Sequence, residues 1–269
     1  MLTVFINKVV PAQSASKSSL FICLLGGFLF GCGGGGGDGS QAPQPPPVTS
    51  PVGIWNGTVS LGGSVVNELS CLVAISNQLG CVLIDPATDR LAGGVLGSVS
   101  ATGAVVGGSG TMYAANGYSF ANGSTVAPFT ISGGTVTARS SIAFTASAAG
   151  QSYAISASFD PLYDRGASLA NVAAVYRGTL IAGVAASFSI NATGMLFAQA
   201  TNGCVANGQV SVIDSRYNGY NVTVTISSCA GLNGTYSGLG VTLDADGANN
   251  MFLFGVFNAT GGFVGSPTK

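Results

Sequence analysis

The sequence predicts an all-β protein built from antiparallel meander units, as sandwiches or barrels, and two observations carry this prediction. Short runs rich in Val, Ile, Phe, Tyr and Thr recur from Gly53 onward, and glycine or asparagine separates them. No stretch of twelve residues there has the periodicity of an amphipathic helix with a charged outer face. Many short strands joined by tight turns favour hairpins, and hence sheets that pack or close on themselves.

The predicted strands are short and closely spaced. They cover residues 54–61, 69–75, 129–137, 141–146, 153–159, 175–181, 187–190, 209–213, 220–226, 236–243 and 251–257. Asn-Gly and Asp-Gly pairs occur among them, and such pairs adopt positive φ angles in tight turns at low cost. Turns are therefore predicted at Asn56-Gly57, Asn116-Gly117, Asn122-Gly123, Asn207-Gly208, Asn218-Gly219, Asn233-Gly234 and Asp246-Gly247.

The chain after residue 52 has two similar halves. Residues 54–59, Ile-Trp-Asn-Gly-Thr-Val, correspond to residues 175–180, Val-Tyr-Arg-Gly-Thr-Leu. We expect each half to open with a strand whose aromatic side chain, Trp55 or Tyr176, fills a small β core, while the glycine permits a close backbone approach. A chance match in a chain rich in glycine and threonine is the alternative.

The boundary between the halves is predicted near residues 166–171, just before the second opening strand. This places a first β domain at residues 53–169 and a second at residues 170–269. Whether the halves are separate domains or one continuous barrel stays open at this point.

Residues 1–31 have the features of a bacterial signal peptide. Residues 1–19 contain two lysines and no acidic residue, and residues 20–31 form an apolar run. A run of this length suits the core of a signal peptide and is too short to cross a bilayer as a helix. The sequence therefore predicts an exported protein.

The apolar run ends in Leu29-Phe30-Gly31-Cys32, which resembles the lipobox of bacterial lipoproteins. In that family a signal peptidase cuts before the cysteine, which carries a diacylglyceryl group and an acylated amine with palmitate-type chains. The resemblance implies that Cys32 is lipidated and holds the chain to a membrane, because several acyl chains anchor stably where one binds marginally. An ordinary secretory signal with an incidental cysteine is the alternative.

Residues 32–52 are expected to form a tether between the lipid and the folded body. Five glycines at 33–37 precede a proline-rich stretch, so a flexible segment leads into a stiff, extended one. This tether resembles those of surface lipoproteins of the transferrin-binding and factor-H-binding types. In Gram-negative lipoproteins the residue after the lipidated cysteine influences sorting, and Gly33 in place of aspartate implies the outer membrane.

Most of the body resembles a group of Gram-negative lipoproteins that share a lipobox, a Gly/Pro tether, a Gly-x-Trp-x-Gly-Thr opening and a C-terminal β domain. The matching residues are 53–58, 163–169, 203–204, 207–208, 218–220, 229 and 234–238. The resemblance implies an envelope lipoprotein with a duplicated β domain, and it carries no activity with it.

Four cysteines follow the lipobox, and an even number in an exported chain predicts disulfides. Three pairings are open, and the two halves suggest Cys71–Cys81 and Cys204–Cys229. A hairpin centred near residues 76–77 would place the first two opposite each other. A metal site is the rival interpretation, but the spacings lack a Cys-x2-Cys pair and the chain has no histidine.

Composition excludes several function classes. The absence of histidine excludes Ser-His-Asp hydrolases and histidine-ligated metal sites. Charged residues are only 6% of the chain, and the part from Cys32 onward has six cations against nine anions, a formal charge of −3. Nucleic-acid binding is not expected, because its main electrostatic contribution is missing.

Pairs of aspartates are the remaining candidates for chemistry. Residues 244–249, Asp-Ala-Asp-Gly-Ala-Asn, resemble the beginning of a calcium loop, but the bidentate glutamate that should follow is missing. Two further pairs, at 85 and 89 and at 160 and 164, flank prolines in segments typical of solvated turns. We therefore predict no catalytic residue, no metal and no cofactor, and a protein that is not an enzyme.

These observations predict a non-enzymatic binding or structural module, held in the bacterial envelope by acyl chains that insert in the membrane. An envelope or host protein is the candidate partner. The alternative is a carrier whose lipocalin-like barrel holds a small apolar ligand. A lumen wide enough for a ligand favours the carrier, whereas filled cores favour the module.

Overall fold

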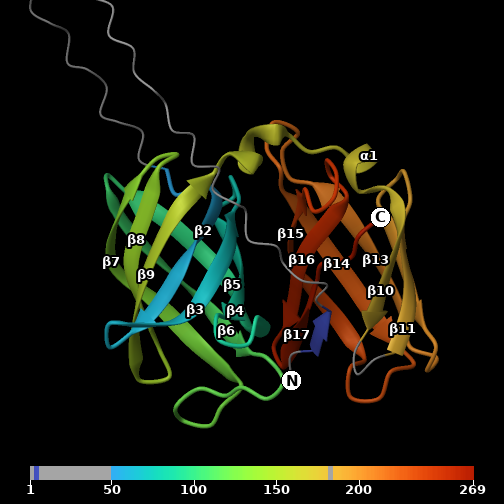
Figure 1. Ribbon diagram of the computed structural model, residues 1–269, viewed down its shortest axis with the longest axis horizontal. Helices are drawn as coiled ribbons and strands as arrows, with labels where there is room; N and C mark the ends of the chain where they lie inside the picture. Colours follow the sequence, from blue (N-terminus) through green and yellow to red (C-terminus); the bar gives the residue numbers. More distant parts are fainter. Residues whose placement is uncertain (1–2, 6–49, 181–183) are drawn as a thin grey trace, which may run out of the picture.

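The computed structural model describes residues 3–5, 50–180 and 184–269. These residues form two β lobes that lie side by side and are joined at one end by short helical turns (Figure 1). The predicted all-β class with two similar lobes is confirmed. Cys32 and nearly all of the predicted signal peptide and tether lie outside the described residues. No helix in the described part of the chain is long and apolar enough to cross a membrane.

The first lobe is a closed barrel in which each strand pairs antiparallel with the next. Its strands are β2 (Gly53–Leu61), β3 (Ser64–Val73), β4 (Gln78–Asp85), β5 (Arg90–Thr102), β6 (Val105–Ala114), β7 (Val126–Thr137), β8 (Ser141–Ala148) and β9 (Gln151–Asp160). The barrel closes where β2 pairs with β9, from Ile54 opposite Asp160 to Leu61 opposite Tyr153.

The second lobe is an antiparallel meander that does not close in the same way. Its strands are β10 (Ala174–Leu180), β11 (Val184–Ile190), β12 (Met195–Ala200), β13 (Val205–Val212), β14 (Tyr220–Ser227), β15 (Gly234–Leu243), β16 (Met251–Asn258) and β17 (Gly261–Gly265). Its first and last strands do not pair with each other, and the short β1 (Thr3–Phe5) runs parallel beside β17. This lobe is therefore a half-barrel.

The two aromatic residues of the repeated opening strand fill the lobes as predicted. Trp55 is 1% exposed in the core of the barrel, and Tyr176 is fully buried in the core of the second lobe. Each donates a hydrogen bond to the carbonyl four residues earlier, from Trp55 Nε1 to Pro51 O and from the Tyr176 hydroxyl to Val172 O, both at 2.7 Å. The bonds satisfy the buried polar end of each ring, as buried Trp and Tyr require.

A short connection joins the lobes and covers one end of the second. It consists of the 3-10 helix η1 (Pro161–Arg165) and the single turn α1 (Leu169–Val172), which begin after Asp160 and Ser168 respectively. The side chain of each of these residues accepts a hydrogen bond from a backbone N–H of the turn that follows, the usual role of a helix N-cap. Val172 is fully buried in the second core, so α1 caps this end of the lobe.

Six strands were not among those predicted, namely β1, β4, β5, β6, β12 and β17. Strands β5 and β6 are rich in glycine, which weakens the alternation of apolar and polar side chains on which the prediction rests. The glycines have a packing reason. Gly97 pairs with Gly110, and a Cβ added at Gly110 would lie 2.7 Å from the ring of Phe129 on β7. The paired glycines therefore make room for that aromatic ring inside the barrel.

Two of the predicted turns are wrong for a related reason. Asn56-Gly57 lies inside β2 and Asn207-Gly208 inside β13. A Cβ added at Gly57 would lie 2.0 Å from Ser156 O, and one at Gly208 would lie 2.1 Å from a carbonyl oxygen of β14. Glycine is needed at both positions because a neighbouring strand passes too close for a side chain, and not because the chain turns there.

The lobes share an apolar interface between their outer faces. The barrel contributes Ile54, Leu72, Val82, Ile84, Leu91, Tyr113 and Ala115, and the second lobe contributes Leu239, Val241, Leu253, Phe257 and Val264. The rings of Tyr113 and Phe257 stack with their centroids 4.6 Å apart. Gly80 and Gly94 admit the partner surface, since a Cβ added at Gly94 would lie 2.5 Å from the Phe257 ring. The two cores are separate, but the lobes are not independent of each other.

The interface predicts a position-dependent cost for adding side chains to the barrel. We expect Gly94→Val to lower the free energy of unfolding by about 1–3 kcal/mol, because the new side chain meets the Phe257 ring. Gly107→Val is the matched control, since its Cβ meets nothing within 4 Å, and its effect should stay within about 0.5 kcal/mol. Urea denaturation measures both, and equal effects would contradict the packing role of Gly94.

Candidate functional site

The interiors of the two lobes differ in how completely side chains fill them. The space left inside the barrel is only about 60 Å³. The second lobe contains a cavity of about 320 Å³. An eight-stranded barrel is just wide enough for its side chains to fill, or to hold one small ligand. The first lobe is an example of the filled kind, and the second lobe has room for a ligand.

Large side chains and a disulfide fill the barrel. The rings of Trp55 and Phe159 meet edge to face with their centroids 5.6 Å apart. Cys71 and Cys81 lie opposite each other on β3 and β4 and form a disulfide against the same core. This bridge agrees with the pairing predicted from the sequence.

Small residues on two strands create the cavity in the second lobe. Ala198 and Ala200 on β12 and Ala206 on β13 line it, whereas Phe188, Phe254 and Phe263 enclose it from other strands. The remaining lining residues are Leu196, Asn202, Cys204, Val205, Val224, Ile226, Cys229, Ala230, Leu232 and Val256. The wall is almost entirely aliphatic or aromatic.

The cavity occupies one end of the second lobe because the other end is filled. Tyr176, Tyr220 and Phe252 are fully buried near α1, and the rings of the last two meet edge to face at 5.7 Å. Tyr220 opens β14 at this end, whereas Cys229 lies two residues beyond the end of the same strand. The cavity therefore lies at the end where β12 turns into β13 and β14 turns into β15.

A turn at residues 229–232 covers this end. It contributes Cys229, Ala230 and Leu232 to the lining. The Cys204–Cys229 disulfide ties it to the neighbouring turn, in agreement with the predicted pairing. The hydroxyl of Tyr236 also donates a hydrogen bond to Leu232 O at 3.0 Å. The turn is held at both of its ends, so the mouth has a defined shape.

The cavity offers very little polar chemistry. Asn202 is the single polar side chain in its lining, and its Oδ1 accepts a hydrogen bond from Cys204 N at 3.2 Å. No Asp, Glu, Lys or Arg is among the described residues that line the space, and its two cysteines are joined in the disulfide. The arrangement can enclose an apolar group and offers it no acid, base or nucleophile.

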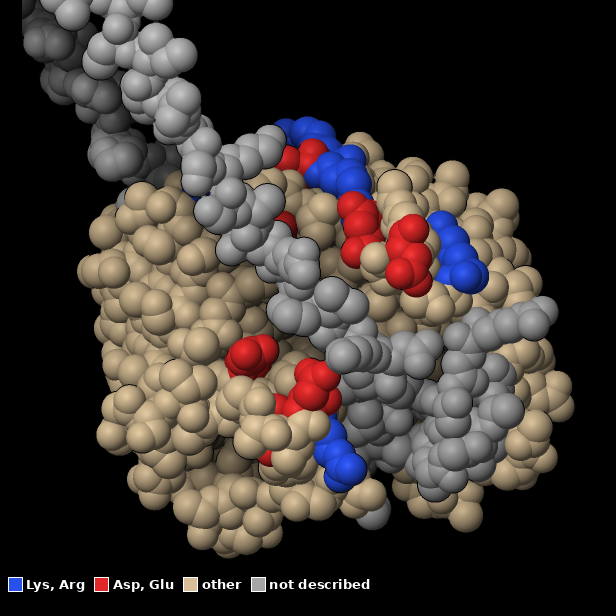
Figure 2. Space-filling view, viewed as in Figure 1, with Lys and Arg blue, Asp and Glu red and all other residues tan. Residues whose placement is uncertain are grey.

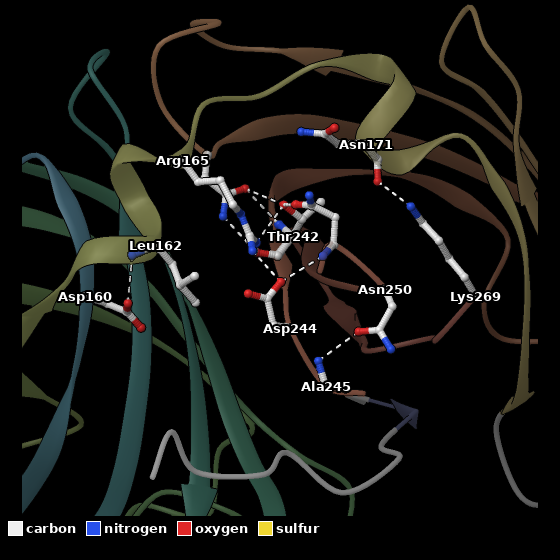
Figure 3. A network of polar contacts seen from close by, with 11 residues as sticks. Asp160, Leu162, Arg165, Asn171, Thr242, Asp244, Ala245, Asn250 and Lys269 are labelled. Atoms are coloured by element: carbon white, nitrogen blue, oxygen red, sulfur yellow. Dashed lines mark hydrogen bonds and ion pairs between the residues drawn. The ribbon is translucent and has the colours of Figure 1, made fainter. Parts of the chain in front are cut away.

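Charged side chains in the second lobe gather at the opposite end, around η1. Figure 2 shows that the charged groups on this face gather near its upper edge and in a second group lower down. Arg165 reaches from η1 to β15, where it forms an ion pair with Asp244 and donates from Nη2 to Thr242 O at 2.6 Å (Figure 3). Asn218 donates to the same carbonyl at 2.7 Å and accepts from Thr242 N at 2.9 Å. This network fixes the connection between the lobes.

The aspartates considered as candidates for chemistry take part in such local contacts. Asp244 accepts a hydrogen bond from Asn249 N at 2.8 Å besides its ion pair with Arg165. Asp160 caps η1, and Asp164 forms an ion pair with Arg139. The remaining pair lies in the turn between β4 and β5, at residues 85 and 89, where the Tyr118 hydroxyl lowers the pKa of Asp85. Within the described residues no cluster of three or more His, Cys, Asp or Glu could hold a metal ion.

Of the predicted site residues, the structure pairs the four cysteines, and Cys32 lies outside the described residues. The cavity itself was not predicted as a site. Its one signal in the sequence is the small side chains at alternate, inward positions of β12, and these are unremarkable until the facing strands are known.

Comparisons with known protein families, with curated proteins and with solved structures find no match to this chain.

The difference between the interiors predicts that an Ala→Phe substitution destabilises the barrel much more than the second lobe. Ala198→Phe places a ring in the cavity, so we expect the free energy of unfolding to change by less than about 1 kcal/mol. Ala146→Phe introduces the same ring into the filled barrel and should lower it by about 1–3 kcal/mol. Urea denaturation compares the two variants. Equal destabilisation would mean that the second lobe is packed as tightly as the first.

Proposed function

We propose that the protein is a lipid-anchored lipoprotein of the bacterial envelope whose second lobe binds a small apolar ligand. The observation that carries this proposal is the apolar cavity of about 320 Å³ beside a filled barrel of otherwise similar construction. Ligand pockets are typically about 300–1,000 Å³, mostly apolar, and contain few polar groups. The cavity meets each of these criteria at the small end of the range.

The cavity volume limits the size of the ligand. An engineered apolar cavity of about 150 Å³ in another protein stays dry and binds benzene. The cavity in this protein is about 320 Å³, so it suits a molecule about twice as large, on the order of twelve carbon atoms. Each buried methylene contributes roughly 0.8 kcal/mol before the costs of binding are subtracted. Burial of the chain can therefore account for binding without charged contacts.

The anchoring part of the proposal rests on the lipobox and the tether. Acyl chains on Cys32 would hold the body at the outer membrane, and the Gly/Pro segment would separate the two. The two disulfides support an oxidising compartment, where such bridges persist. We propose binding without catalysis, because the cavity offers a ligand no titratable side chain.

A protein partner at the outer face of the second lobe is a second candidate. Val175, Met195 and Phe197 are 63%, 61% and 44% exposed, and Val175 and Phe197 lie on either side of Ser189 in the paired strands β10 to β12. Exposed apolar groups gathered on one face are typical of contact surfaces. Phe197→Ser should weaken such a contact and leave binding in the cavity unchanged.

Ligand binding is tested with the oxidised protein from residue 32 onward, in which Cys32→Ser prevents acylation. Binding of 1-decanol should raise the melting temperature. At a free ligand concentration of one hundred times the Kd, binding adds about 2.7 kcal/mol to the free energy of unfolding. Ala198→Phe fills the cavity and should abolish the shift. The same shift in both proteins would place the ligand elsewhere and contradict the proposal.

Anchoring is tested by labelling cells with a radioactive fatty acid. The wild-type protein should take up label, and Cys32→Ala should not. Cys23→Ala is the matched control, because this cysteine lies within the apolar run of the signal peptide and should not affect labelling. Equal labelling of all three proteins would contradict lipidation at Cys32.

A further inference from the structure

The lining of the cavity also restricts the chemical class of its ligand. We propose that the second lobe binds an electrically neutral, single-chain amphiphile of about ten to twelve carbons, whose oxygen-bearing head lies beside Asn202. This inference rests on the proposed function and adds the charge and the orientation of the ligand. Two features of the lobe support it, namely the distance of the described charged side chains from the cavity and the hydrogen bonds of Asn202.

Among the side chains that the structure describes, no charged one lines the cavity to pair with an ionic head. The charged side chains described in the second lobe belong to the turns and the C-terminus at the α1 end. Ala167 N bonds to Ser215 O beside Asp214 and Arg216, and Lys269 Nζ donates to Asn171 O. The buried rings near α1 separate these groups from the cavity. At the mouth an ionised head would lose part of its hydration and gain no charged partner among the described side chains, so a charged head is disfavoured relative to a neutral one.

The mouth does offer one hydrogen-bond donor. Asn202 Oδ1 is occupied by Cys204 N, and no hydrogen bond from its Nδ2 is found within the described residues. An amide N–H donates and cannot accept, so it suits an oxygen acceptor on the ligand. A hydroxyl, ether or carbonyl group meets this requirement while staying neutral. The rest of the molecule must be hydrocarbon, because aliphatic and aromatic side chains and the disulfide form the remaining wall.

The shape of the cavity favours a slender chain over a bulky ring system. Three alanines on β12 and β13 form one side of the space, and three phenylalanines stand on the other strands. The rings of Phe188, which is the strand neighbour of Ala198, and Phe254 stack with their centroids 5.8 Å apart and give the lining a continuous aromatic surface. A flexible hydrocarbon chain can follow such a surface between the mouth and the filled end near Phe252.

The experiment compares three ligands of equal chain length by isothermal titration calorimetry at about pH 8, where a carboxylic acid is ionised. These are 1-decanol, decanoate and decyltrimethylammonium, each kept below its micelle concentration, and the protein is the oxidised Cys32→Ser form. We expect decanol to bind at least about tenfold more tightly than either ion, which corresponds to 1.4 kcal/mol. The affinity of decanoate should rise as pH falls toward its pKa of about 4–5, whereas that of decanol should not change.

Equal affinity of decanol and decanoate at this pH would overturn the proposed ligand class while leaving the cavity function intact. Failure of all three compounds, and of n-octane as a headless hydrocarbon, would instead contradict the proposed function itself. The two failures are therefore distinguishable in one series.

The role of Asn202 is tested with Asn202→Asp. This variant keeps the oxygen that accepts from Cys204 N, so the turn is preserved, but it removes the amide donor and adds a negative charge. We expect decyl methyl ether, whose oxygen can only accept a hydrogen bond, to bind about 3–10-fold more weakly, the loss of one hydrogen bond, and n-octane to bind unchanged. Decyltrimethylammonium should gain affinity in the variant. Unchanged affinity for the ether would overturn the placement of the head group at Asn202.

Discussion

The size of the side chains that face inward is the constraint on which the rest of this structure depends. Each lobe winds eight strands around an interior that is only slightly wider than its own side chains can fill. In the barrel, Trp55, Phe129 and a disulfide take up that space, and β2 pairs with β9 along its whole length. In the second lobe, alanines on β12 and β13 leave the space open, and the edge strands do not pair. The same topology thus yields one solid lobe and one hollow lobe.

The contact between the lobes gives the solid barrel a role in the hollow one. Leu239 and Leu253 on β15 and β16 face the barrel through their outer side, so these strands are packed on both faces. Among the described residues none is seen to pack on the outer face of β12, whose outward side chains are exposed, and the inward alanines of β12 and β13 line the cavity. Because packed interiors resist deformation, the barrel stiffens the wall formed by β15 and β16. A cavity with one rigid wall supports the proposal that the second lobe binds a ligand.

The sequence was sufficient for the fold class and the disulfides, and insufficient for the cavity. Alternating apolar residues and close spacing predict strands without knowledge of their neighbours, and ten positions between Cys71 and Cys81 suit a hairpin, which turns at Asn77 with φ 64°. The glycine-rich β5 and β6 were missed because their reason lies in Phe129 of another strand. The volume of a cavity depends on all the side chains around it, so Ala198 and Ala206 indicate a cavity only when the positions of the phenylalanines on other strands are known. Periodicity along one strand contains no information about that volume.

The polar network at the η1 end explains how the second lobe tolerates an open end. Arg165, Asn218 and Thr242 tie the connection to β15 through buried hydrogen bonds, and buried polar networks specify a single arrangement when their groups are satisfied. One atom in this network, Arg165 Nε, is buried with no hydrogen-bond partner among the described residues, so the arrangement is maintained at some cost. The opposite end needs no comparable network, because the Cys204–Cys229 bridge restrains its turns covalently. The polar network holds one end of the lobe and the disulfide holds the other. The space between them can therefore remain unfilled by the protein's own side chains.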